Sequence, residues 1–412
     1  MNGPVGIEYL NVYGGRAAVD VHDIFTARGL DTARLDNLMM RRKAVGLPCE
    51  DPVTNAVNAA RPVLERIGAD GRERIELLIT ATESGVDFGK SVATYVHKYL
   101  ELPANCRVFE LKQACYGGTA ALQMAVGQIA AGLSPGGKAL IIATDVARPS
   151  VKLTYAEPSQ GVAAVAMLVG DDPGVLDLDL GAHGVHAFEV LDTCRPDGET
   201  ETGDPDLSLM CYLDCLEAAF ADYARRVEGA DFVASFDGLA FHTPFAGMVK
   251  GAHRHLMRRR HRAAPADIAD DFERRLAPSL RYCVEVGNSY SATVFVALAG
   301  LVDGLGARAA YRAGLFSYGS GCCAEFFSGI VPAGAAERQA AFAIGAALEA
   351  REQLDIARYD AVLALNAEWR FGLRDKLLDR KPFADLYERC FAGRGLLVLT
   401  GIEGYHRQYA WS

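Results

Sequence analysis

The sequence lacks the features of secreted, membrane-spanning and nucleic-acid-binding proteins. Its 412 residues contain no run of about 18 apolar residues, the length that a membrane-spanning helix needs. The N-terminus has no basic stretch followed by an apolar one, so we expect no signal peptide. Positive charge is in deficit, with 42 Lys and Arg against 52 Asp and Glu, and the net charge of −10 argues against general nucleic-acid binding. These absences favour a cytoplasmic protein that binds neither a membrane nor a nucleic acid.

Cysteine is present, but not in the patterns of disulfide scaffolds or zinc sites. The 10 cysteines form no Cys-x-x-Cys pair, and the chain is too long for a small fold held together by disulfides. His253 and His255 are not accompanied by carboxylates or thiolates at metal-ligand spacing. We therefore expect no metal ion and mostly buried, reduced thiols, with room for one nucleophile among them.

Low-complexity tracts and flexible linkers are also absent, and 50% of the residues are hydrophobic, so the chain can bury a large core. Apolar strand-like runs alternate with helix-like segments, which is typical of an α/β protein with a largely parallel sheet. A small-residue helix followed by a buried strand occurs over 117–145 and again over 291–318. The repeat indicates two similar halves meeting near 171–180, although such units also arise by chance. Residues 335–358 are expected to form one long helix.

Cys115 has the most suggestive setting of the thiols, because it follows a strand-like run and opens a glycine-containing helix. The positive end of a helix dipole favours a thiolate there, although a buried structural thiol is the alternative. Glu83 follows the apolar strand predicted at 74–82. A carboxylate in that place is either a desolvated base or a helix N-terminal charge.

Three further polar residues lie where loops leave the predicted strands and helices. His242 follows a short apolar run and precedes Thr-Pro, so it is either a general acid or base or a surface histidine. Asn288 and Ser320 stand beside glycines. Their amide and hydroxyl groups can bind a carbonyl or oxyanion, although turn formation explains either residue alone.

The sequence segments around these residues together resemble the 3-hydroxy-3-methylglutaryl-CoA synthase family over nearly the whole chain. The branch of the family that works in polyketide β-branching is the closer match, through DTCRPDGETETGDPDLSLMCYLDC and FSYGSGCCAEFFSG. Several motifs in family order are far more specific than a lone cysteine or histidine. The segments that carry the resemblance are ATESGVDFGKS, ELKQACYGGTAALQMA, EPSQGVAAVAML, FHTPFAGMVKGAHR, VGNSYSAT and FSYGSGCCAEFFSG.

The resemblance implies an α/β protein with a thiolase-like fold, in which two pseudo-duplicated halves stack in five αβαβα layers. The N-terminal half then spans 1–175 and carries Glu83 and Cys115. The C-terminal half spans 176–412 and carries His242, together with the asparagine and the Gly-Ser-Gly loop of the site. The active site is expected between the halves, and the family resemblance also implies a homodimer.

The family's catalytic triad falls on Glu83, Cys115 and His242, all of which are present. The segment between 147 and 155 is shorter than the family pattern, which leaves open what covers the acyl pocket. The residues that the resemblance assigns to substrate binding are Asn288, Ser320, Tyr155 and Lys250.

The chemistry implied by the resemblance is an aldol addition without decarboxylation. Cys115 takes an acetyl group from a donor acetyl-acyl carrier protein, and Glu83 removes a proton from its methyl group. The enolate attacks the β-ketone of an acceptor β-ketoacyl-acyl carrier protein of a polyketide synthase, while His242 donates a proton to the alkoxide. Hydrolysis then releases the β-branched product. No cofactor is expected beyond the phosphopantetheine or CoA that carries the substrates.

Three alternatives to this function stay open. A decarboxylating ketoacyl synthase of the same fold would also use Cys115, His242 and Asn288, but it needs no base equivalent to Glu83. A mevalonate-pathway synthase would use free CoA substrates. A catalytically silent scaffold would only bind carrier proteins, which an intact triad argues against.

The acidic net charge limits where an acidic carrier protein can bind, so recognition requires local positive charge. Arg258, Arg259 and Arg260 form the strongest basic cluster, just beyond Lys250, and are expected to dock the carrier protein. Residues 41–43 form a second basic group. A solvated helix face is the alternative explanation for either group.

Overall fold

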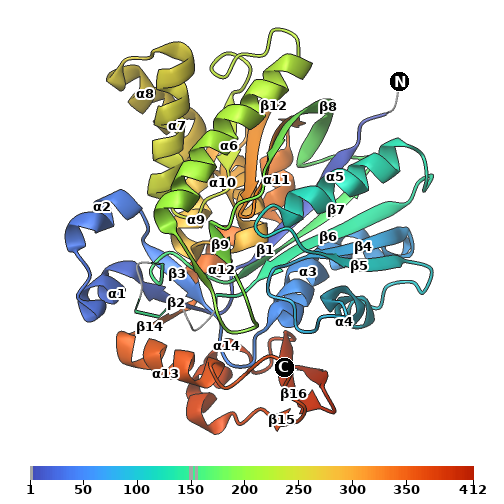
Figure 1. The fold of residues 1–412 in the computed structure, drawn as a ribbon. Helices are drawn as coiled ribbons and strands as arrows, with labels where there is room; N and C mark the ends of the chain where they lie inside the picture. The colour runs from blue at the N-terminus through green and yellow to red at the C-terminus, as the bar shows by residue number, and fades with distance from the viewer. Residues whose placement is uncertain (1–2, 148–151, 154–155) are drawn as a thin grey trace.

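The computed structural model describes residues 3–147, 152–153 and 156–412 (Figure 1). Its largest sheet has nine strands in the order β11-β12-β13-β8-β1-β7-β6-β4-β5. The strands are β1 (Gly6–Tyr13), β4 (Ile75–Ala81), β5 (Arg107–Leu111), β6 (Lys138–Asp145), β7 (Ala163–Gly170), β8 (Leu176–Ala187), β11 (Gly238–Phe241), β12 (Tyr311–Gly319) and β13 (Cys323–Val331).

The pairing pattern of this sheet repeats on either side of its middle. From β1 outward, the pairs to β7 and from β7 to β6 are antiparallel, and the pair from β6 to β4 is parallel. From β8 outward, the pairs to β13 and from β13 to β12 are antiparallel, and the pair from β12 to β11 is parallel. The two sets meet where Gly6 and Ile7 of β1 pair with Asp177 and Leu176 of β8. The molecule therefore contains two halves of similar topology; the division at 175 stays a prediction.

Helices lie outside and between the strand sets. α3 (Pro52–Glu73) packs on β1, β6 and β7, and α6 (Pro205–Arg226) packs on β8 and β13. Between the sets, α5 (Gly117–Ala130) packs on β4 and β6, while α10 (Thr293–Leu305) packs on β11 and β12. α10 is apolar on nearly all sides because it is buried from Thr293 to Val302. This order of layers agrees with the predicted αβαβα arrangement.

Close contact between the two central helices depends on glycine. A Cβ atom at Gly118 would lie 2.5 Å from the backbone oxygen of Ser291 and 2.9 Å from the Phe295 ring. The absence of a side chain therefore lets α5, which begins just after Cys115, approach the segment that leads into α10. This approach brings the loops of the two halves together at one site.

Two predictions of secondary structure are wrong. The sheet is mixed rather than largely parallel, and strands such as β6 and β7 are buried along their whole length, so they lack the alternation that marks many antiparallel strands. The long helix expected at 335–358 is broken where Ala343 adopts a left-handed φ of 49°. It is replaced by α11 (Ala335–Ala340), α12 (Ile344–Glu349), β14 (Glu352–Leu354) and the start of α13 (Ile356–Asn366).

The remaining segments form smaller units around the sheet, including a C-terminal region at the bottom of Figure 1. Within the described ranges, no helix combines the length and the apolar character needed to cross a bilayer. These segments include β2 (Ala17–Asp20), β3 (Arg42–Val45), α1 (Val21–Arg28), α2 (Leu35–Leu38), α4 (Val92–Tyr99), α7 (Ala246–His261), α8 (Pro265–Asp271), α9 (Leu280–Val286), α14 (Ala384–Cys390), β15 (Lys376–Leu377), β16 (Leu397–Glu403) and β17 (His406–Trp411).

Candidate active site

Cys115 lies in the tight turn between β5 and α5. Ala114, just before it, has a left-handed φ of 43°, and the Gly117 N–H donates to the Ala114 carbonyl to close the turn. The thiol is 9% exposed, and its Sγ donates a hydrogen bond of 3.4 Å to Oε1 of Glu83. Burial, followed by the charge of Glu83, raises the pKa of Cys115 well above its usual value. The thiol form is therefore favoured in the unliganded protein, because burial and the charge of Glu83 oppose the effect of the helix dipole.

Glu83 begins the loop that follows β4, and its carboxylate is in contact with groups of both signs. Its Oε2 lies 3.3 Å from Nε of Arg195, opposite the oxygen that contacts the thiol. Burial raises the pKa of Glu83 to about 7; Arg195 opposes that rise, whereas Asp145 and Glu201 add to it. A carboxylate that titrates near neutrality can act as a general base at physiological pH.

Asp145, the last residue of β6, joins the loops of the two halves. Its Oδ1 accepts hydrogen bonds from Thr82 Oγ1 at 3.0 Å, the Glu83 N–H at 2.9 Å and Ser84 Oγ at 2.8 Å. Its Oδ2 accepts from the backbone N–H of Ser291 at 3.1 Å and from its hydroxyl at 2.5 Å. Because Ser291 comes from the second half, this buried carboxylate ties the base to the segment that leads into α10.

The Gly-Ser-Gly loop at 319–321 lies against the segment that carries the thiol. A Cβ atom at Gly319 would lie 2.6 Å from the backbone nitrogen of Tyr116, so only glycine allows this approach. Gly321 has a φ of 114°, and its N–H donates to Oδ1 of Asp192 at 3.0 Å. Tyr318 donates to the other oxygen of that buried carboxylate at 2.6 Å. Asp192 thus holds the loop that carries Ser320, which is half-buried.

His242 is buried just after β11. Its backbone N–H donates to the Phe316 carbonyl at 2.7 Å, and the hydroxyl of Tyr212 donates to its carbonyl at 2.7 Å. The imidazole lies beside the rings of Tyr212 and Tyr318, with centroids 6.4 and 6.5 Å away. Burial lowers the pKa of His242 to about 3, so the ring is neutral at neutral pH. Within the described ranges its Nδ1 is buried and has no hydrogen-bond partner.

Asn288 is held by its own loop. Its backbone N–H donates to the Ser159 carbonyl at 2.6 Å. The side-chain Oδ1 accepts from the Tyr290 N–H at 2.9 Å and from Thr293 Oγ1 at 3.1 Å. Because the oxygen is occupied by these two donors, the NH₂ group is the end of the amide that can bind a substrate carbonyl.

Known proteins match this chain over nearly its whole length. Models of the N-terminal and C-terminal parts of hydroxymethylglutaryl-coenzyme A synthase match residues 4–174 and 255–409. A Bacillus subtilis protein, the polyketide biosynthesis 3-hydroxy-3-methylglutaryl-ACP synthase PksG, is 48% identical over 98% of this chain and 99% of its own. The chain belongs to the hydroxymethylglutaryl-CoA synthase family.

Solved structures of the family superpose closely on this fold. The curacin biosynthetic pathway HMG synthase in complex with acetyl donor-ACP is 50% identical, with a TM-score of 0.96 over 99% of this chain and 100% of that one. MvaS in complex with 3-hydroxy-3-methylglutaryl coenzyme A is 35% identical, with a TM-score of 0.88 over 100% of both chains. The hydroxymethylglutaryl-CoA synthase of Enterococcus faecalis is 32% identical over 87% of this chain and 91% of its own. These matches confirm the family resemblance and the thiolase-like fold.

Some of the predicted site residues are in contact, whereas others are exposed or lie outside the described residues. Glu83 and Cys115 are in direct contact, and the loop with Ser320 borders the thiol segment. Tyr155 lies outside the described residues. Lys250 is exposed on α7, where its Nζ lies 5.1 Å from the centre of the Phe272 ring, so its predicted role in substrate binding stays a prediction.

Sequence reasoning missed the residues that hold the triad in place. Asp145 was assigned only to a buried strand, and its position as the last, charged residue of an apolar run was an unused signal. Asp192 and Arg195 lie in the DTCRP segment, which contributed only to the family match. Arg195 contacts Glu83, and Asp192 holds the Gly-Ser-Gly loop. Their local pattern is that of an ordinary polar loop, so only their long-range contacts identify them.

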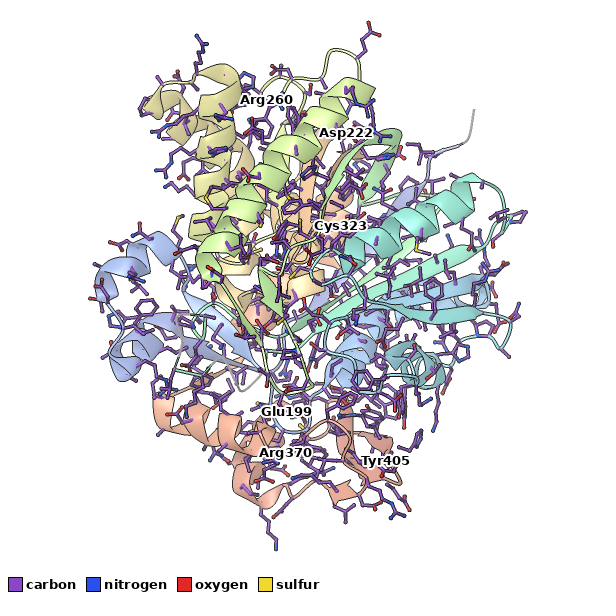
Figure 2. All side chains as sticks on the ribbon, viewed as in Figure 1. Glu199, Asp222, Arg260, Cys323, Arg370 and Tyr405 are labelled. Atoms are coloured by element: carbon purple, nitrogen blue, oxygen red, sulfur yellow. The ribbon has the colours of Figure 1, made fainter. Side chains whose placement is uncertain are left out.

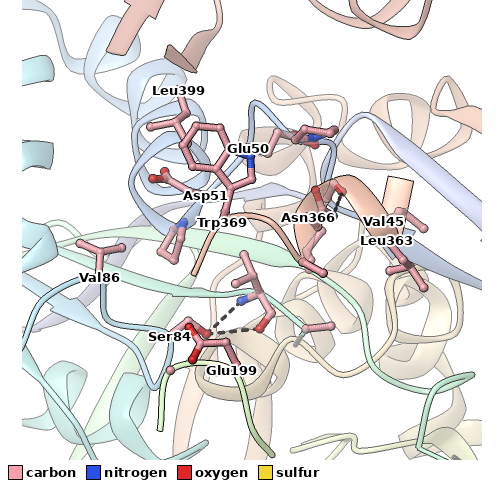
Figure 3. A pocket seen from close by; sticks show the side chains of 18 of the residues that line it. Val45, Glu50, Asp51, Ser84, Val86, Glu199, Leu363, Asn366, Trp369 and Leu399 are labelled. Atoms are coloured by element: carbon pink, nitrogen blue, oxygen red, sulfur yellow. Dashed lines mark hydrogen bonds between the residues drawn. The ribbon is translucent and has the colours of Figure 1, made fainter. Parts of the chain in front are cut away.

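A cavity of about 130 Å³ adjoins the base on the side of Ser84 and the C-terminal region (Figure 3). Ser84 is at its edge, and its hydroxyl bonds to both Asp145 and the backbone of Val146. Trp369 lines the cavity from the C-terminal region, and Glu199 from the loop after β9 (Thr193–Cys194). Ser84 therefore borders both this cavity and the cluster of buried carboxylates.

Proposed function

We propose that this synthase adds a Cys115-bound acetyl group to the β-ketone of a β-ketoacyl chain on an acyl carrier protein, and so installs a β-branch during polyketide biosynthesis. The observation that carries the proposal is the contact of 3.4 Å between the Glu83 carboxylate and Cys115 Sγ. It places a base beside the atom that would carry the acetyl group. Identities of 48–50% to proteins named for polyketide pathways, against 32–35% to those named for CoA substrates, support the carrier-protein form.

The first step is acetylation of the thiol. Cys115 Sγ attacks the donor thioester, the bond from the acetyl carbon to the carrier sulfur breaks, and the proton of the thiol goes to that sulfur. The phosphopantetheine arm or CoA enters as part of the substrate.

The second step makes the nucleophile. Ionised Glu83 removes a methyl proton from the acetyl group, and the enolate oxygen needs hydrogen-bond donors because a thioester α-proton is only weakly acidic. The backbone N–H groups of Cys115 and of the Gly-Ser-Gly loop are proposed as those donors. One such donor typically contributes about 3–4 kcal/mol to a transition state.

The third step forms the carbon–carbon bond and then frees the product. The enolate attacks the β-ketone, whose oxygen is polarised by the N–H of neutral His242, as neutral imidazoles do in other enolisation sites. Because burial keeps the His242 ring neutral, the proton that Glu83 removed returns to the alkoxide, in place of the proton donation by His242 that the family resemblance implies. The Asn288 NH₂ group orients the carbonyl, and water then hydrolyses the Cys115 thioester.

A decarboxylating ketoacyl synthase is the alternative that Glu83 distinguishes. We expect Glu83→Ala to become acetylated at Cys115 but to form no condensation product. Removing the carboxylate takes away a charge and a hydrogen bond that both raise the pKa of the thiol, so the first step survives. Intact-mass measurement of the enzyme and of the acceptor carrier separates the two steps. Undiminished condensation by this variant would refute the assignment, and Cys115→Ala, which should not be acetylated, is the control.

The carrier-protein form is tested by substrate competition. With acetyl-acyl carrier protein as donor, we expect turnover of a β-ketoacyl-acyl carrier protein to exceed turnover of acetoacetyl-CoA by at least about tenfold in kcat/KM, equivalent to roughly 1.4 kcal/mol of transition-state binding. A preference for CoA as both donor and acceptor would favour the mevalonate-pathway alternative instead. Absence of any acetyl label on Cys115 would favour the silent scaffold.

The three arginines of the basic cluster at 258–260 do not all face the same way on α7. Arg259 lies 3.4 Å from the Glu217 carboxylate, and Arg260 donates to the Glu217 carbonyl and lies over the Phe220 ring, so both turn toward α6 (Figure 2). Arg258 is exposed on the same turn. At helical spacing it aligns with other exposed cations, so we propose as the carrier-protein dock the stripe of Lys250, Arg254 and Arg258.

Charge reversal tests this stripe. We expect Arg254→Glu with Arg258→Glu to weaken donor carrier-protein binding on the order of tenfold at low salt, and to flatten its dependence on ionic strength. The matched control is Arg259→Glu, which lies on the side that faces α6. Binding titrations across salt concentrations give the result. An unchanged affinity in the double variant, or an equal loss in the control, would exclude the stripe.

The edge of the sheet supports the proposed homodimer. β5 is the terminal strand on one side, so one row of its backbone groups has no neighbouring strand within the described chain. Edge strands of this kind pair readily with a second chain.

The cytoplasmic location and the absence of a metal ion stay predictions. The exposed trio Asp20, His22 and Asp23, which alone of the described groups has metal-ligand spacing, shares no residue with the site.

A further inference from the structure

Arg195 holds both the catalytic base and the turn that carries it. Its Nε lies 3.3 Å from Oε2 of Glu83. Its Nη1 donates to the Glu83 carbonyl at 3.1 Å and to Ser84 Oγ at 3.0 Å. The arginine side chain is 10% exposed, so these contacts are little screened by solvent. One guanidinium therefore fixes the carboxylate, the backbone and the neighbouring hydroxyl of the same turn.

A second set of contacts fixes the guanidinium from its other side. Nη2 lies 2.9 Å from Oε2 of Glu201, and the Tyr290 hydroxyl donates to the same oxygen at 3.1 Å. Gln160 donates to the other carboxylate oxygen at 2.5 Å. The Tyr290 ring lies under the guanidinium, 4.5 Å from its central carbon. Arg195 is thus clamped between an aromatic ring and two carboxylates, which is a geometry that the planar arginine head satisfies and lysine does not.

The charges around Glu83 are otherwise all of the same sign. Asp145 faces it from the end of β6 and Glu201 from the loop beyond Arg195, while the uncharged Cys115 thiol contacts it from the turn before α5. Arg195 is the cation that contacts this group among the described residues. Without it, the Glu83 carboxylate would face two other acidic groups with no cation in contact, which would disfavour its ionised form.

We propose that Arg195 is the positioning residue for carbon–carbon bond formation, because it fixes the Glu83 carboxylate beside Cys115 and supplies the positive charge that this carboxylate needs. Glu201 partly offsets the positive charge of Arg195. The inference rests on the proposed function, since it takes Glu83 as the base for the acetyl methyl group. It gives Arg195, which lies in the DTCRP segment, a role in the condensation step rather than in acylation of Cys115 or in substrate binding.

Arg195 and Glu201 shift the pKa of Glu83 in opposite directions. Burial raises the pKa of Glu83 to about 7, Arg195 lowers it, and Glu201 raises it. Condensation needs ionised Glu83, so its rate rises with pH through the pKa of that carboxyl. Removing the guanidinium must move this rise to higher pH, and removing the Glu201 charge must move it to lower pH.

The experiment compares Arg195→Gln, Arg195→Lys and Glu201→Gln in single-turnover condensation from enzyme already acetylated at Cys115, across a pH series. For Arg195→Gln we expect the midpoint of the rise to move up by about 1–3 pH units, the usual range for a carboxylate beside arginine. Glu201→Gln is expected to move the midpoint down. Arg195→Lys keeps a midpoint near that of the wild type but has a lower plateau, because an ammonium cannot bridge both the carboxylate and the turn.

A lower plateau with an unchanged midpoint in Arg195→Gln would overturn the proposal, since that is the signature of a purely structural role. A shift of Glu201→Gln in the same direction as Arg195→Gln would overturn it as well. If Arg195→Gln does not fold, as judged by circular dichroism, the other two variants decide the question. Failure of the proposed function is distinguishable, because the wild-type enzyme would then show no condensation at any pH.

Discussion

The site depends on one constraint: a carboxylate must stay charged while buried against a thiol. Three acidic groups, Glu83, Asp145 and Glu201, lie near one another with little exposed surface, and the guanidinium of Arg195 contacts Glu83 and Glu201. Burying like charges is costly unless they are paired and hydrogen-bonded. The Asp145 carboxylate accepts five hydrogen bonds. The Glu83 carboxylate is paired with Arg195 and accepts a hydrogen bond from Cys115.

The architecture serves this constraint by bringing loops from both halves to one place. Asp145 ends a strand of the first half but binds Ser291 of the second. Gly319 ends a strand of the second half but contacts the thiol segment of the first. Gly118 lets the central helices approach closely enough for both contacts. The two sets of strands therefore hold the Glu83 carboxylate beside the Cys115 thiol, whose pKa is raised first by burial and then by that charge.

Local pattern predicted much of this molecule, and long-range contact accounts for the rest. The helix and strand of each repeated unit, α5 with β6 and α10 with β12, were found because small-residue helices and buried strands have clear periodicity. The mixed direction of the sheet was missed because strands buried on both faces read alike whether parallel or antiparallel. Cys115 and Glu83 stood out by motif, but Arg195, Asp145 and Asp192 act through partners distant in the sequence. Burial and the charge of Glu83 raise the pKa of Cys115 against the helix dipole, and neither effect can be read from the local sequence.

The central claim is that Glu83 makes an enolate from the acetyl group on Cys115, before and independently of any acceptor. The most direct measurement is deuterium incorporation into the acetyl methyl group of the acetylated enzyme in D₂O, with no acceptor present, followed by mass spectrometry of the Cys115 peptide. The account predicts that the methyl group gains deuterium in the wild-type enzyme and retains its protons in Glu83→Ala. A wild-type methyl group that never exchanges, or one that exchanges equally well without the Glu83 carboxylate, would contradict it.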